Sequence, residues 1–208
     1  MTAVTGTRAQ RRAAATRQAV VEAAREIIAS EGADAVTLEA VAERADVAVQ
    51  TIYNRVGGRS ALLTAVAEMA MEENRAYMDA AYEAEGTVEE RLLRAAAAYV
   101  RFARERPHEF RILVDPPDEP ETLDRIASLI EEQNAKLTDV LRDGIATGTS
   151  RPDLDPDRVS TVLWATMNGL LALAWRADKL RPDADELDAL LATYVETIAD
   201  GLRRRAAH

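Results

Sequence analysis

The feature that most constrains this chain is the stretch from Thr37 to Leu63, TLEAVAERADVAVQTIYNRVGGRSALL, which predicts two short helices joined by a tight turn. Four residues recur at helical spacing and give the first of these helices one apolar face: Leu38, Val41, Ala42 and Ala45. Asp46 is expected to end that helix, because aspartate is one of the few non-glycine residues that tolerate a left-handed backbone.

The second short helix leaves most of its surface to solvent. Val47, Ile52 and Val56 continue the apolar pattern, and the residues left to face outward are Ala48, Val49, Gln50, Tyr53, Asn54 and Arg55. Amide and phenol groups are of the kind that contact bases and phosphates. A helix-turn-helix with such a second helix fits a DNA major groove, so we expect DNA binding. A helical hairpin used only for packing is the alternative.

Charge is divided unevenly along the chain. The 208 residues carry a net charge of −10, which by itself disfavours DNA as a partner. Residues 1–60, however, hold eight arginines against seven acidic residues, and the first twenty residues hold four arginines and no acid. Because phosphate binding depends on local charge, this division predicts a DNA-facing N-terminal part and an acidic remainder held away from the duplex.

The composition favours an all-α protein. Aromatic residues make up only 4% of the chain, alanine is abundant, and β-branched clusters are few. No apolar run is long enough to span a membrane, and the N-terminus lacks the apolar core of a signal peptide, so we expect a cytoplasmic protein. With no cysteine and with His108 and His208 as the two histidines, we expect no metal, no cofactor and no enzyme activity.

Helical periodicity and breaker residues predict about nine helices. A first long helix over about residues 9–30 ends at Gly32, Thr37 caps the second helix, and Thr87 with Glu90 has capping-box spacing. The other long helices are expected over about residues 59–85, from 87, 119–147, 156–179 and 184–205, with a short segment at 107–114. These elements predict a three-helix DNA-binding domain over residues 1–58 and a larger helical bundle over residues 59–208.

Several features of residues 17–66 occur together at fixed spacing. They are a first helix ended by Gly32, then Thr37, Val41-Ala42, Val47, the triplet Thr51-Ile52-Tyr53, Arg59 and Ala61-Leu62-Leu63. In this combination the stretch resembles the DNA-binding domain of TetR-type transcriptional regulators. The resemblance implies a homodimer whose recognition helices enter successive major grooves of a palindromic double-stranded DNA operator. It also implies repression by operator occupancy, with activation by the same fold as an alternative.

The resemblance implies DNA contacts at seven positions. Phosphate contacts are implied for Thr37, Thr51, Tyr53 and Arg59, and base-edge contacts for Val49, Gln50 and Asn54. The chemistry agrees, because Gln50 can pair with adenine and Val49 can pack on a thymine methyl group. Internal capping is the competing role for Thr51, and packing on the first helix is the competing role for Tyr53.

The chain departs from the family pattern at residues near the expected DNA. Asp46 stands where the family usually has glycine, and Glu39 is expected to face the DNA, so both acids work against phosphate binding. Arg59 replaces a common lysine and keeps the charge. These changes put the operator sequence in doubt. Three further arginines are expected to form either a basic arm on DNA or a solvated tail: Arg8, Arg11 and Arg12.

The segment from Trp164 to Gly169, followed by Leu170-Leu171, is similar to a Trp-x-x-x-His-Gly pattern in one class of TetR C-terminal domains, with Asn168 in place of the histidine. The analogy implies that the last two helices form a four-helix interface with a second copy. The expected interface residues are Asn168, Leu171, Trp175, Leu187, Leu191, Tyr194 and Ile198.

The resemblance also implies a pocket within the bundle for a small-molecule effector that changes the spacing of the two DNA-binding heads. The candidate lining residues are Tyr77, Met78, Tyr82, Tyr99, Phe102, Phe110, Trp164 and Met167. Core packing is the competing role for each. Few charged residues accompany them, which indicates a neutral or hydrophobic effector. A rival interpretation, a helical protein-interaction bundle whose helix-turn-helix has lost DNA affinity, stays open because residues 1–60 carry a net charge of only +1.

Overall fold

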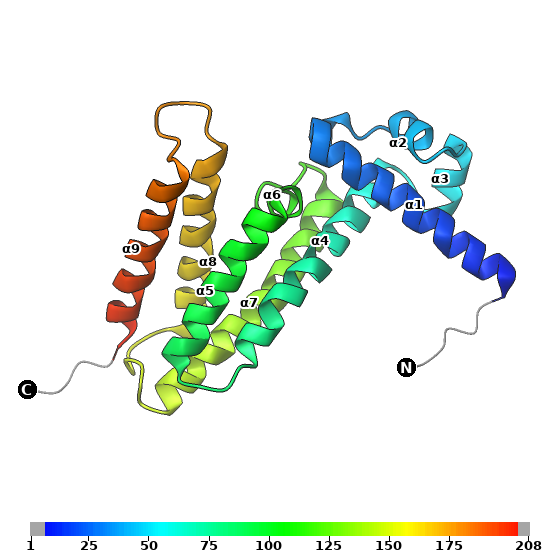
Figure 1. Cartoon of the computed structure of the whole chain (residues 1–208). Coiled ribbons are helices and arrows are strands. Elements are labelled where there is room, and N and C mark those ends of the chain that lie inside the picture. Colours follow the sequence, from blue (N-terminus) through cyan, green and yellow to red (C-terminus); the bar gives the residue numbers. More distant parts are fainter. Residues whose placement is uncertain (1–6, 204–208) are drawn as a thin grey trace, which may run out of the picture. The chain divides into compact units, whose positions relative to one another are not determined.

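The computed structural model describes residues 7–203 and contains, within them, nine α-helices, two 3-10 turns and no strand (Figure 1). The helices are α1 (Arg8–Glu31), α2 (Leu38–Arg44), α3 (Val49–Arg55), α4 (Arg59–Tyr82), α5 (Val88–Glu105), α6 (Pro107–Val114), α7 (Pro120–Ala146), α8 (Pro156–Ala172) and α9 (Ala184–Leu202). The 3-10 turns are Ala33–Ala35 and Leu173–Trp175. The predicted all-α fold is confirmed.

The helices group into two compact units. The head unit contains the residues up to Glu72 together with His108–Leu129, and the bundle unit contains Glu73–Pro107 together with the residues from Ile130 onward. Both divisions in the second half of α4 and in α7 fall inside continuous helices. Residues 59–72, which the sequence assigned to the second domain, therefore pack in the head unit. A functional boundary at Gly58 stays a prediction.

Helix α1 begins earlier than its apolar pattern. Thr7 and Gln10 form a capping box, in which the Thr7 hydroxyl accepts from the Gln10 backbone N–H at 3.2 Å. Arg8, Arg11 and Arg12 thus belong to the first turns of α1, so the prediction of an extended arm or a tail at these three residues is wrong. The preceding residues of the predicted arm lie outside the described part of the chain. The other end of α1 closes at Gly32, whose φ of 89° suits glycine.

The core of the head unit is apolar throughout its helix-turn-helix part. Between Arg8 and Val66 every buried side chain is apolar, and the fully or nearly fully buried ones are Val20, Val21, Ala24, Ile27, Val36, Val41, Ile52, Leu62, Leu63 and Val66. These residues come from α1, α2, α3, the first half of α4 and the connection before α2. Apolar burial of this kind supplies most of the stability of a small helical domain.

The bundle unit is built from antiparallel neighbours, apart from the parallel pair α4 and α7. Tyr77 of α4 packs its ring against Phe102 of α5 with ring centres 5.6 Å apart, and the predicted capping box at Thr87 and Glu90 opens α5. An apolar cluster fills the interior, formed by Met78, Ala81, Tyr82, Val88, Ala95, Leu137 and Val140.

Helix α8 is shorter than predicted. The apolar pattern suggested a helix to Lys179, but the α-helix ends at Ala172 and is followed by the 3-10 turn. The Asp178 carboxylate accepts from the backbone N–H of Leu180 at 3.0 Å and from Arg176 Nε at 2.9 Å. Such local side-chain bonds compete with helical backbone bonds and favour a turn here.

The end of α9 is attached to the loop that precedes α8. Ser150 and Arg203 form an isolated β-bridge, and the Arg151 backbone N–H donates to the Leu202 carbonyl at 3.0 Å. Arg203 also forms an ion pair with Glu89 of α5 at 2.5 Å. Along residues 7–203, no helix is both long and apolar enough to cross a membrane.

Candidate functional site

The two short helices of the head unit form the predicted helix-turn-helix. The Thr37 hydroxyl caps α2 by accepting from the Ala40 backbone N–H at 3.1 Å, as expected. Asp46 has φ 52°, and it is the one non-glycine residue with a positive φ in the described part of the chain. The predicted left-handed turn at Asp46 is therefore confirmed, and the strain it carries explains why glycine suits this position.

Helix α3 presents a polar face outward. Ile52 is completely buried and holds α3 on the head core, while Gln50, Asn54 and Arg55 are exposed and Tyr53 is 54% exposed. Val49 and Thr51 are half-buried. The predicted division of α3 into a buried and an outward face is confirmed. Contact of these residues with DNA stays a proposal.

Two amides on the outward face of α3 contact each other. Gln50 Nε2 donates to Asn54 Oδ1 at 3.3 Å, one helical turn away. The Gln50 carbonyl and the Asn54 amino group remain to face a partner. A base edge that offers one donor and one acceptor, as adenine does in the major groove, matches this pair chemically.

Arg59 has a structural role that the sequence did not indicate. Its guanidinium donates to the Val36 carbonyl at 2.8 Å and the Ala33 carbonyl at 2.9 Å, and it forms an ion pair with Glu119. The side chain therefore holds the connection that leads to the Thr37 cap. A phosphate contact would use only the N–H groups that these three partners leave.

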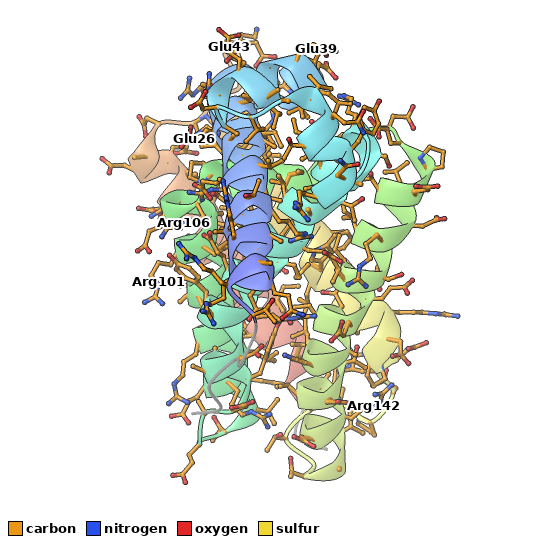
Figure 2. All side chains as sticks on the ribbon, turned by 90° about the vertical axis from the view of Figure 1, so that its right-hand side faces the viewer. Glu26, Glu39, Glu43, Arg101, Arg106 and Arg142 are labelled. Atoms are coloured by element: carbon orange, nitrogen blue, oxygen red, sulfur yellow. The ribbon has the colours of Figure 1, made fainter. Side chains whose placement is uncertain are left out.

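Acidic side chains accompany the helix-turn-helix. Figure 2 shows Glu39 and Glu43 projecting outward from α2, and Glu26 projecting from α1. Glu31 pairs with Arg44 at 3.3 Å, which removes one acid from this surface. The remaining carboxylates limit the attraction of the head unit for phosphate.

The head unit also contains a buried ion pair. Glu109 of α6 is 6% exposed and pairs with Arg25 of α1, which also bonds to Glu22 at 3.0 Å. The sequence analysis did not identify this pair, and the signal for it was an acid inside the apolar segment HEFRILV. Within residues 7–203, Glu109 is the one buried acid, so no facing pair of buried carboxylates occurs there. The same part of the chain holds no group of three potential metal ligands.

The residues predicted to line an effector pocket are divided between the two units. Phe110 lies in the head unit, so it does not belong to the bundle interior that was predicted for it. In the bundle unit four of the predicted residues are buried and three are half-buried; in chain order they are Tyr77, Met78, Tyr82, Tyr99, Phe102, Trp164 and Met167. Their role as a pocket stays a proposal.

Tyr99 and Asn168 form a polar contact inside the bundle. The Tyr99 hydroxyl donates to Asn168 Oδ1 at 2.7 Å, and burial raises the pKa of Tyr99 above its usual value. The phenol therefore stays protonated and keeps its role as a donor. Asn168 stands where the resemblance expected histidine, and here it accepts a hydrogen bond inside its own chain.

A groove of about 500 Å³ lies between α5 and α9. Its apolar lining comes from Leu93, Ala96, Ala97, Val100, Met167, Leu191, Ala192 and Val195, and its charged lining from Arg101, Arg104, Glu105 and Asp188. Met167 is the predicted pocket residue that lines it. Arg104 and Asp188 form an ion pair between α5 and α9.

Four residues predicted at a dimer interface are buried within the chain itself. Asn168, Leu171, Leu187 and Leu191 are each at most 7% exposed, so they pack α8 and α9 into the bundle unit and are not available to a second copy. Their assignment to a subunit interface is wrong. Trp175, Tyr194 and Ile198 are half-buried, and the Tyr194 hydroxyl donates to the Leu163 carbonyl at 2.9 Å.

Three solved structures share the fold. A protein of unknown function from Rhodococcus sp. RHA1 is 23% identical, with a TM-score of 0.75 over 91% of this chain and 96% of that chain. The fatty acid degradation regulator FadR from Bacillus halodurans is 19% identical, with a TM-score of 0.74 over 91% and 97% of the two chains. FadR from Bacillus subtilis, in complex with stearoyl-CoA, is 18% identical, with a TM-score of 0.74 over 89% and 99%. At these identities the likeness establishes the fold alone, and no curated protein matches the chain.

Family comparisons cover most of the sequence. The family described as "Bacterial regulatory proteins, tetR family" matches residues 20–66, which include α2, α3 and the start of α4. The "Tetracyclin repressor-like, C-terminal domain" matches residues 92–198, more than half of the chain. Regulators of this kind bind DNA and are not enzymes. With both of its parts matched, the chain belongs to the TetR family of bacterial transcriptional regulators.

Proposed function

We propose that the chain is a cytoplasmic repressor that binds a palindromic operator as a homodimer and is released by a small neutral or hydrophobic effector. The observation that carries this proposal is the outward face of α3, where Gln50, Tyr53 and Asn54 are exposed on a helix anchored by the buried Ile52. An exposed polar face on a firmly packed short helix suits base and phosphate contacts.

The seven proposed DNA contacts divide by chemistry. Thr37, Thr51, Tyr53 and Arg59 would contact phosphates, and Val49, Gln50 and Asn54 would lie at base edges. The Thr37 hydroxyl proton is available for a phosphate oxygen, because its oxygen serves as an acceptor in the cap. Positioning by phosphates and discrimination by the amides would then act together.

Dimerisation would use the faces of α8 and α9 that the bundle leaves exposed. Val162 is 55% exposed on α8, and small exposed residues continue this face at helical spacing: Ala165, Thr166 and Gly169 on α8, and Ala189 and Thr193 on α9. Small side chains allow two helices to approach closely. We therefore place the interface one face away from the buried leucines.

A hydrophobic effector is supported by the interior of the bundle unit, where the cluster around Met78 and Tyr82 is apolar. The stearoyl-CoA bound to FadR from Bacillus subtilis shows that this fold accommodates a fatty-acyl ligand in that protein. An effector that enters the bundle of this chain would shift the equilibrium between operator-bound and free states only if it prefers one of them.

The experiment that tests the function is selection of bound fragments from random and genomic DNA by the purified full-length chain at moderate salt. We expect an enriched palindrome with half-sites about one helical turn of DNA apart. Affinity for that palindrome should fall steeply as salt rises, because cationic side chains displace counterions from the phosphates.

The matched control is a Gln50→Ala/Asn54→Ala double variant, which keeps Ile52 and the head core intact. It should lose the enriched sequence and retain weak, salt-dependent DNA binding. If the parent chain is folded and dimeric but enriches no sequence, the repressor proposal fails and a protein-interaction bundle becomes the better account.

A further inference from the structure

Two buried amide atoms in the bundle unit have no hydrogen-bond partner. They are Asn74 Nδ2 on α4 and Gln133 Oε1 on α7, and the two residues are 3% and 6% exposed. A buried polar atom without a partner lowers stability, so native proteins keep few of them. One of these atoms is a donor and the other is an acceptor.

The orientation of the Gln133 amide is determined by a neighbouring charge. Gln133 Nε2 donates to Asp79 Oδ1 at 3.4 Å, and the same oxygen accepts from Lys136 Nζ at 2.6 Å. Reversing the amide would place its carbonyl against a carboxylate, which repels it. Oε1 therefore points away from Asp79 and cannot gain a partner by reversal of the amide.

The two amides lie at the same level of a parallel helix pair. In the bundle unit α4 and α7 run side by side, because Arg75 pairs with Glu132 at 2.9 Å and Asp79 pairs with Lys136 (Figure 1). Asn74 and Gln133 are the chain neighbours of the first ion pair. Each also lies one helical turn before a member of the apolar cluster, Met78 on α4 and Leu137 on α7.

The other buried polar side chains at helix contacts of this unit satisfy each other. Thr138 donates to Ser160 at 2.8 Å, and Tyr99 donates to Asn168 at 2.7 Å. Asn74 and Gln133 differ because their free atoms are complementary to a third group. That group must accept one hydrogen bond and donate one, and it must be neutral, since Asp79 and Lys136 already neutralise each other.

We propose that Asn74 and Gln133 form the polar anchor of the effector site, holding a hydroxyl or carboxamide group of a ligand whose remaining part is apolar. The inference rests on the proposed ligand-responsive function. Asn74 Nδ2 donates to the oxygen of the ligand group, and Gln133 Oε1 accepts from its O–H or N–H. The apolar part lies along the cluster, where the flexible Met78 side chain can make room.

The test compares two probes that differ in one hydrogen-bond donor, decanol and decyl methyl ether. Their binding to the full-length chain is measured by calorimetric titration, with thermal unfolding as a second readout. We expect decanol to bind about tenfold more tightly than the ether, because only decanol can both accept and donate.

Three variants locate the effect. Asn74→Leu and Gln133→Met keep the side-chain volume and remove the unpaired atoms, so each should reduce decanol to the affinity of the ether. Because they remove unsatisfied atoms, they should unfold at the same temperature as the parent or higher. Thr138→Val removes a hydroxyl that has a partner and should leave the tenfold preference intact.

Equal affinity of decanol and the ether for the parent chain overturns the inference, as does binding of neither. A decanol preference that survives in both amide variants also overturns it, and a buried water would then account for the two atoms. If the preference is found but the chain enriches no operator, the anchor stands and the repressor proposal fails. If an operator is enriched without the preference, the anchor alone fails.

Discussion

The helix-turn-helix part of the head unit and the bundle unit place their polar groups in opposite locations. From Arg8 to Val66 all buried side chains are apolar, and the amides and phenol of α3 lie on the surface. The bundle unit buries Asn74, Gln133, Thr138, Ser150, Ser160 and Asn168. The first region is built to offer chemistry to a large partner outside it. The second has chemistry only for something small enough to enter.

The largest expected effect tests whether the head core is as simple as this comparison states. Ile52→Ala removes a completely buried side chain and should lower the free energy of unfolding by about 2–5 kcal/mol. Urea denaturation followed by circular dichroism measures the loss. Val162→Ala, at a site that is 55% exposed, is the control and should change stability by less than about 0.5 kcal/mol. Equal effects of the two variants would contradict the assignment of Ile52 as the anchor of α3.

The next effect tests the paired polar groups of the bundle. Asn168→Leu leaves the Tyr99 hydroxyl buried without its acceptor and should destabilise the chain by about 1–3 kcal/mol. The double variant Asn168→Leu/Tyr99→Phe removes both partners and should recover part of that loss. Thermal unfolding of the three proteins gives the coupling energy. A double variant no more stable than Asn168→Leu would show that the hydrogen bond is not the reason for burying Asn168.

A base-specific effect is expected from the outward face of α3. Gln50→Ala should relax the preference at one base pair of each half-site by about 1–3 kcal/mol and leave the other positions unchanged. Competition among single-base variants of the enriched operator measures this. A uniform loss at all positions would assign Gln50 to the phosphate backbone.

A uniform effect is expected from the neighbouring phenol. Tyr53→Phe removes one hydroxyl and should weaken binding to every sequence by about 0.5–1.5 kcal/mol. Fluorescence anisotropy with the operator and with an unrelated duplex gives the two losses, which should be equal. A loss confined to the operator would place Tyr53 at a base edge.

The smallest effect concerns the strained turn between α2 and α3. Asp46→Gly relieves the left-handed backbone and should stabilise the chain by up to about 1 kcal/mol. It also removes an acid near the expected phosphates, so operator affinity should rise at low salt. Asp46→Ala removes the same acid but keeps the strain, and it should lower the unfolding temperature. If both variants stabilise the chain equally, the charge and not the backbone is the source of the effect.

Local features were predictable from the sequence, since their partners are close along the chain. The Thr37 cap, the left-handed Asp46 and the capping box of Thr87 and Glu90 each depend on residues no more than four positions apart. The periodicity of α3 likewise identified its buried and outward faces. The end of α8 was missed although it is local, because the turn-forming bonds of Asp178 were outweighed by a continuing apolar pattern.

Features that depend on distant residues were not predictable in the same way. An apolar helix face shows that something covers it, but it does not show whether a second copy or the same chain does. Leu171, Leu187 and Leu191 were therefore assigned to a subunit interface although their own bundle buries them. Asn74 and Gln133 resemble ordinary surface amides in the sequence, and only the packing of α4 on α7 makes them unusual.

Helix α9 is attached unequally at its two ends. Its last residue is bonded through the backbone to the loop before α8, whereas its first residue, Ala184, follows a connection whose residues 176–181 are all exposed. Local opening of α9 should therefore begin at Ala184 and decrease toward Leu202, which amide hydrogen exchange would record as a gradient of protection. The final turns would fix the register of the helix, while the first turns, which carry Asp188 of the α5–α9 groove, would remain free to adjust.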